Sequence, residues 1–135
     1  MNHFDELLKL LDSAYAPYSD FHVASIVVTR DGRIFKGVNV ESVAYSTTLC
    51  AERNAIFSAV TEGVKPGDIA EVHILARNAK NDLFPAYPCG SCRQIIAEQS
   101  LNNATVYVYR SKTDISQHSI TELLPYAFSS LTDTL

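Results

Sequence analysis

The dipeptide Asp31-Gly32 stands between two apolar runs rich in β-branched residues, and this feature strongly constrains the fold. Aspartate followed by glycine, flanked by such runs, is a strong signal for a tight turn joining two antiparallel strands. The runs at 23–29 and 34–40 are therefore predicted to pair as a hairpin. The hairpin supplies an antiparallel edge to the sheet that the rest of the chain must build.

Strands and helices alternate after the hairpin. The pattern predicts helices at about 49–62 and 89–99, strands at 69–76 and 105–109, a short helix at 119–124, loops at 41–48 and 77–88, and a frayed end at 129–135. Strands that alternate with helices pair in parallel, with the helices as crossovers. Helical spacing from Phe4 to Tyr15 predicts one more helix, with Asn2 as its N-cap and an end before Pro17.

We therefore expect an α/β fold. Its mixed β-sheet has an antiparallel N-terminal hairpin and parallel C-terminal strands, and helices cover both faces. The length of 135 residues fits a single domain, 1–135, and the hydrophobic fraction of 47% excludes a disordered chain. The net charge of −4 and the lack of a basic block argue against nucleic-acid binding. No apolar run is long enough to predict a membrane span, and no signal-peptide pattern is present, so we expect a cytoplasmic protein.

The three cysteines cannot all pair within one chain, so they require an explanation other than disulfides. Cys89 and Cys92 form a C-x-x-C pair, and both predicted helices that carry cysteines begin at them, one at Cys50 and one at Cys89. Helix N-termini favour thiolates, and zinc takes thiolates in tetrahedral geometry. Three protein ligands would leave the fourth position open, which is typical of a catalytic zinc site.

Charged neighbours support this interpretation. Arg53 and Arg93 each lie close to a cysteine and could donate hydrogen bonds to the sulfurs, offsetting their negative charge. Glu52 lies in the first turn after Cys50, where its carboxylate could take a proton from an activated water without ligating the metal. Three alternatives stay open at this point: a thioredoxin-like redox pair, a structural zinc module without catalysis, and buried inert cysteines.

The motifs Cys50-Ala-Glu-Arg53 and Pro88-Cys-Gly-Ser-Cys-Arg-Gln94 resemble those of the zinc-dependent cytidine deaminases, in their small homotetrameric three-cysteine form. The segment from Ala14 to Phe21, the stretch from Asp31 to Glu41 and the closing motif from Glu122 to Phe128 are similar to the family in the same order. The resemblance covers nearly the whole chain.

The resemblance implies hydrolytic deamination of cytidine and deoxycytidine in pyrimidine salvage, with one zinc per subunit and Glu52 as the proton shuttle. It implies zinc ligation by Cys50, Cys89 and Cys92, and Arg53 as a supporting residue. The substrate-binding residues that it implies are Phe21, Asn39, Glu41, Tyr45, Ala51 and Phe128, of which Asn39 and Glu41 bind the ribose and Phe128 comes from a neighbouring subunit. The expected partner is a nucleoside, bound in active sites shared between the subunits of a homotetramer.

The chain departs from the common family pattern at Ala24, Ser42 and Tyr87, which leaves fine substrate preference open. Blasticidin-type deaminases share the cysteine motifs and are an alternative, although Glu41, Tyr45 and Arg53 favour cytidine. A deaminase that acts on polynucleotides is disfavoured, because the chain has no basic patch and no aromatic platform for a strand.

Overall fold

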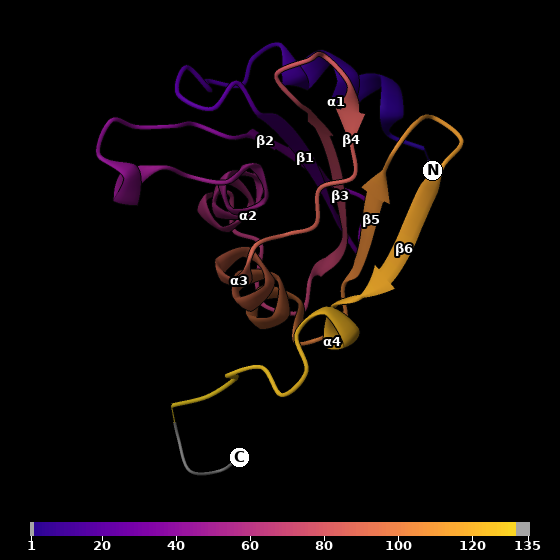
Figure 1. Ribbon diagram of the computed structural model, residues 1–135. Helices are drawn as coiled ribbons and strands as arrows, with labels where there is room; N and C mark the ends of the chain where they lie inside the picture. Colours follow the sequence, from indigo (N-terminus) through magenta and orange to yellow (C-terminus); the bar gives the residue numbers. More distant parts are fainter. Residues whose placement is uncertain (1, 132–135) are drawn as a thin grey trace.

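A computed structural model describes residues 2–131. Within that range one mixed sheet has six strands in the order β2-β1-β3-β5-β6, and the short β4 pairs with β3 beside this path (Figure 1). The expected α/β architecture is confirmed. No helix in this part of the chain is long and apolar enough to cross a membrane.

The predicted hairpin is present at one edge of the sheet. Strands β1 (His22–Thr29) and β2 (Ile34–Val38) pair antiparallel, with Ala24 opposite Val38 and Val28 opposite Ile34. Strand β2 ends two residues earlier than predicted. At that point the backbone N–H of Val23 donates to the Asn39 side-chain oxygen, and the Asn39 carbonyl accepts from Tyr15 instead of from β1.

The C-terminal half contains one parallel pair, β3 (Ile69–Arg77) with β5 (Thr105–Tyr109), and α3 is part of the crossover between them. Two strands lie in segments that were not predicted as strands. They are β4 (Leu83–Phe84), antiparallel to β3, and β6 (Ile115–Ser119), which pairs antiparallel with β5 and forms the second edge.

Helices cover both faces of the sheet, as predicted (Figure 1). On one face, α1 (Phe4–Leu11) packs through Leu7 and Leu11 on β1 and β3. On the other face, α2 (Ala51–Thr61), α3 (Gly90–Ser100) and α4 (Ile120–Leu123) enclose the larger core. That core collects apolar residues such as Val27, Ile56, Val72, Ile74, Ile96, Val106 and Ile120. Alternate residues along β1 and β3 serve the two cores, as the two-residue period of a strand requires.

Several element ends differ from the predictions. Helix α1 ends at Leu11 rather than near Tyr15, because the backbone of Tyr15 bridges to Val40 instead of continuing the helix. The predicted loop at 41–48 contains a short 3₁₀ turn, η1 (Tyr45–Thr47). Helix α4 has the predicted capping box between Ser119 and Glu122. The frayed end predicted at 129–135 lies partly outside the described residues.

Helix α2 lies unusually close to strand β2, and Gly37 is the reason. A Cβ atom at this position would lie 2.4 Å from the backbone nitrogen of Ala55 and 2.5 Å from the carbonyl oxygen of Ala51. Only glycine permits this approach. Because the side chain of Asn54 also donates to the carbonyl of Val38 at 3.0 Å, the first turns of α2 are held against the hairpin.

Candidate active site

The three cysteine sulfurs converge at the N-termini of α2 and α3. Cys50 and Cys89 are the N-cap residues of these helices, and Cys92 lies in the first turn of α3. The Sγ atoms of Cys50 and Cys89 are 3.7 Å apart, those of Cys89 and Cys92 are 3.4 Å apart, and all three lie within 4.8 Å of one another. Zinc with Zn–S bonds of about 2.3 Å in tetrahedral geometry needs sulfurs about 3.8 Å apart, so the donor set fits this metal.

The surroundings of the sulfurs favour negative charge. A hydrogen bond from Cys92 lowers the pKa of the Cys50 thiol to about 5, and Arg53 contributes through Nη2, which lies 3.3 Å from the Cys50 sulfur. Cys92 keeps its proton to donate that hydrogen bond and is also buried, so the pKa of its thiol is raised. Arg93 does not serve the same purpose as Arg53. It donates instead to the carbonyl oxygens of Pro88 and Leu123, both at 2.7 Å.

Glu52 lies beside the sulfurs and is buried, with 4% of its surface exposed. Burial raises the pKa of its carboxyl group to about 7, and the negative charge of Cys50 adds to the effect. A carboxyl group whose pKa is near neutrality can both accept and return a proton, which is what a general acid and base must do. The position of Glu52 in the first turn of α2 brings it there, one residue after the buried Ala51.

A cavity of about 210 Å³ opens over this group. It is lined by Phe21, Val23, Asn39, Thr48, Leu49, Cys50, Ala51, Glu52, Ala86, Tyr87 and Cys89. Six of the residues named from the sequence therefore meet around one space: Phe21, Asn39, Cys50, Ala51, Glu52 and Cys89. Cys92 is fully buried next to Cys89.

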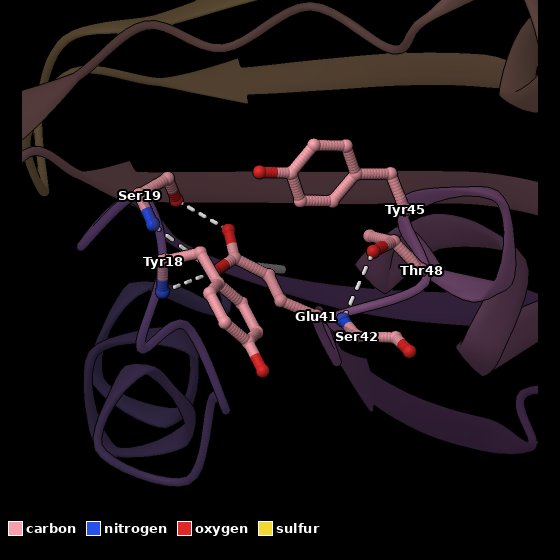
Figure 2. A pocket seen from close by; sticks show the side chains of 6 residues that line it. All are labelled: Tyr18, Ser19, Glu41, Ser42, Tyr45 and Thr48. Atoms are coloured by element: carbon pink, nitrogen blue, oxygen red, sulfur yellow. Dashed lines mark hydrogen bonds between the residues drawn. The ribbon is translucent and has the colours of Figure 1, made fainter.

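Two further predicted residues, Glu41 and Tyr45, line a second and larger cavity of about 420 Å³ (Figure 2). Its wall also contains Thr48, which lines the first cavity as well, so the two spaces adjoin. The Glu41 carboxylate accepts hydrogen bonds from the backbone of Tyr18 at 2.9 Å and of Ser19 at 3.1 Å, and one from the Ser19 hydroxyl. The Ser19 hydrogen bond is the main reason that the pKa of Glu41 is lowered.

Asn39 connects the first cavity to the sheet. Its side-chain amide donates to the carbonyl of Phe21 at 2.8 Å, and its side-chain oxygen accepts from the backbone of Val23 at 2.9 Å. These bonds fix the amide while leaving one of its N–H groups available. Phe21 is fixed in turn by the edge of Phe84, with ring centroids 5.8 Å apart.

Phe128 lies apart from both cavities. Its side chain is 61% exposed, and its carbonyl accepts a hydrogen bond from Gln94 of α3 at 2.7 Å. Tyr126 and Leu131 in the same segment are also exposed. The described chain by itself therefore leaves Phe128 outside the space around Glu52.

The structure adds residues that sequence reasoning did not include among the site residues. Thr48 lies where the two cavities meet, and its hydroxyl accepts a hydrogen bond from the backbone of Ser42 at 3.0 Å (Figure 2). Tyr87 lines the cysteine cavity, and its ring lies edge-on to His118 with centroids 5.3 Å apart. The position of Tyr87 directly before Pro88-Cys89 indicates in the sequence that it lies near the site, whereas nothing in the local sequence distinguishes Thr48.

Comparisons with known proteins agree with this geometry. Residues 2–109 match the family described as the cytidine and deoxycytidylate deaminase zinc-binding region. The chain is 43% identical to a cytidine deaminase of Sporosarcina psychrophila over 92% of its own length and 87% of the relative's. It is 36% identical to one of Halalkalibacterium halodurans, over 92% and 89% of the two lengths. A crystal structure of cytidine deaminase from Burkholderia pseudomallei superposes with a TM-score of 0.84 at 37% identity, covering 95% of this chain and all of that one.

Proposed function

Because this chain is an enzyme of the cytidine and deoxycytidylate deaminase family, we propose that it hydrolyses cytidine and deoxycytidine to uridine and deoxyuridine. The reaction releases ammonia and serves pyrimidine salvage. The whole of 1–135 forms one catalytic domain. The observation that carries the proposal is the buried Glu52 carboxyl group beside three converging cysteine sulfurs, next to a cavity that Cys50, Glu52 and Cys89 line.

Cys50, Cys89 and Cys92 would hold one zinc ion per subunit, and the ion would lower the pKa of a water so that, once deprotonated, it could attack carbon 4 of the cytosine ring. Glu52 takes the proton of that water, delivers it to ring nitrogen N3 and then assists the departure of ammonia. The raised pKa of Glu52 suits both transfers. Arg53 offsets the excess negative charge of the thiolates through its bond to Cys50.

The two adjoining cavities bind different parts of the nucleoside. Phe21 and Ala51 contact the pyrimidine beside Glu52 in the smaller cavity. Asn39 and Glu41 bind the ribose hydroxyl groups, and Thr48 lies between the two spaces. Tyr45 closes the wall of the larger cavity. A neutral nucleoside suits this protein, since the net charge of −4 disfavours phosphate groups.

The enzyme assembles as a homotetramer, in which Phe128 packs on the base in a neighbouring subunit. The exposure of Phe128 and Tyr126 supports a surface that another subunit covers. The three free thiols fit a cytoplasmic location, where thiols stay reduced.

Incubation of the purified protein with cytidine, deoxycytidine, cytosine and blasticidin S, followed by ultraviolet spectroscopy, tests the substrate. We expect uridine and deoxyuridine from the two nucleosides, and loss of both products when a chelator removes the metal. E52Q should lower kcat by at least about 100-fold while zinc stays bound, because only the proton transfer is lost.

E62Q, at the C-terminal end of the same helix, is the matched control and should keep full activity. No product from either nucleoside would refute the proposed substrates, and blasticidin S as the only substrate would assign the alternative activity. Full activity of E52Q would refute the proposed role of Glu52.

A further inference from the structure

A second group of metal-ligating side chains lies on the face of the sheet opposite the cysteine site. His3, directly before α1, and Glu71 and His73 of β3 each place one ligand atom within 4.8 Å of the other two. Glu71 and His73 are two residues apart on the strand, so both side chains lie on the face covered by α1. The start of the chain lies close to the β5–β6 hairpin here (Figure 1), where the Asn2 side chain donates to the carbonyl of Lys112 at 2.7 Å.

His73 is held in one orientation. It is 2% exposed, and the ring of Tyr107 stacks on it with centroids 4.5 Å apart and an angle of 6° between the planes. Its Nδ1 lies 2.8 Å from the Tyr109 hydroxyl, and its Nε2 lies 2.8 Å from a Glu71 carboxylate oxygen. Histidines that bind metals commonly have one ring nitrogen fixed by a polar partner, as Tyr109 fixes Nδ1 here, and bind the metal through the other.

His3 is the member of the group that lacks a partner. Its side chain is buried, with 9% of the residue exposed, and its ring lies edge-on to His73 with centroids 4.5 Å apart. Its backbone N–H donates to the Tyr109 hydroxyl at 3.2 Å, but its ring nitrogens make no hydrogen bond to any residue between 2 and 131. Neither ring nitrogen is among the fully buried unpartnered atoms of residues 2–131, so solvent reaches them and an ion can do the same.

We propose that His3, Glu71 and His73 form a second zinc site, separate from the three-cysteine site. Two imidazoles and one carboxylate are a ligand set that zinc accepts, with a water as the fourth ligand. A cavity of about 240 Å³ borders His73, and it is lined by Asn2, His73, Tyr107, Tyr109, Ile115 and Gln117. The bound ion joins the start of α1 to β3 and so stabilises the fold on the face away from the chemistry.

The hydrogen bonds of His73 to Glu71 and Tyr109 allow zinc to bind without a change in the charge of the imidazole ring. Because a carboxylate only accepts, a neutral His73 ring donates Nε2–H to Glu71 and accepts from the Tyr109 hydroxyl at Nδ1. When zinc binds, the imidazole proton lies on Nδ1 and is donated to the Tyr109 oxygen, so Nε2 and the carboxylate are free to bind the ion. Zinc ligands lie about 3.3 Å apart, and the Glu71 side chain, which is 35% exposed, has room to adjust.

Zinc counting tests the site. The unaltered protein and three variants are equilibrated with excess Zn²⁺, passed through a desalting column and analysed for zinc per chain. H3Q and E71Q should each hold one equivalent fewer than the unaltered protein, because removing a ligand costs more than the 10–100-fold in affinity typical of an outer partner. H118Q, which removes an imidazole from β6, is the matched control and should lose none. Added zinc should also raise the unfolding temperature of the unaltered protein more than that of H3Q.

Retention of the full zinc content by H3Q or by E71Q would overturn the proposal, as would an equal loss in H118Q. E71Q changes only the charge of a half-buried strand residue, so it keeps the test valid if H3Q does not fold. The unaltered protein and all three variants carry the same three cysteines. The missing equivalent is therefore counted independently of the deaminase site, and failure of either proposal leaves the other standing.

Discussion

Replacing Gly37 with alanine should damage both the fold and the chemistry. The added Cβ atom would lie 2.4 Å from the Ala55 nitrogen, whereas ordinary contacts begin at 3.4 Å. Helix α2 would therefore have to move away from β2 by about 1 Å, and overpacking of this kind costs about 1–3 kcal/mol. In a domain of this size that corresponds to a fall of about 4 °C in Tm for each kcal/mol.

The same movement displaces Glu52, which lies in the first turn of α2. A displacement of about 1 Å can reduce catalysis about 100-fold, so kcat/KM of G37A for cytidine should fall by that order. Denaturant titration and initial rates measure the two effects. G90A is the control for stability, since a methyl group there meets nothing within 4 Å. Wild-type stability and kcat/KM in G37A would refute the claim that this contact positions the helix.

Three further predictions concern the site. R53Q should lower kcat about tenfold while changing the free energy of unfolding by less than about 1 kcal/mol, because the lost contact is to the Cys50 sulfur; equal losses in activity and stability would count against this. The Ser19 hydroxyl lowers the pKa of Glu41, so this carboxylate stays ionised and KM should stay constant as the pH falls to the ordinary glutamate pKa of 4.5. In S19A the pKa of Glu41 rises, so KM should begin to rise at a higher pH than in the unaltered protein, measured at constant zinc content. F128A should raise KM about tenfold through the lost aromatic contact, whereas Y126A, two residues away and more exposed to solvent, should not.

The elements that the sequence predicted well are those whose local signals agree with their tertiary roles. Asp31-Gly32 marks the hairpin, and apolar periodicity marks the strands and helices that build the two cores. Strand β6 was missed because Ser116, Gln117 and His118 are polar and resemble a loop. They can form a strand because β6 lies at an edge of the sheet, where pairing with β5 alone suffices.

The cysteine site was predictable because its residues are close in sequence to helix starts, whereas the His3–Glu71–His73 group was not. Taken singly, each histidine has no ligand spacing in the sequence. Sheet register places His73 beside Tyr107, and the packing of α1 brings His3 to the same face. Contacts of this kind depend on where whole elements pack, and no local pattern encodes them.

The hairpin also sets the position of the chemical groups, although it contributes none of the zinc ligands. Val40, just after β2, exchanges two backbone hydrogen bonds with Leu49, at 3.0 Å and 2.9 Å, directly before Cys50. With the close contact at Gly37 and the Asn54 bond to Val38, these bonds fix the start of α2 from both sides. A helix that begins at a fixed point presents its first turn in a fixed direction. The edge strand therefore determines where Cys50 and Glu52 lie relative to the cavity.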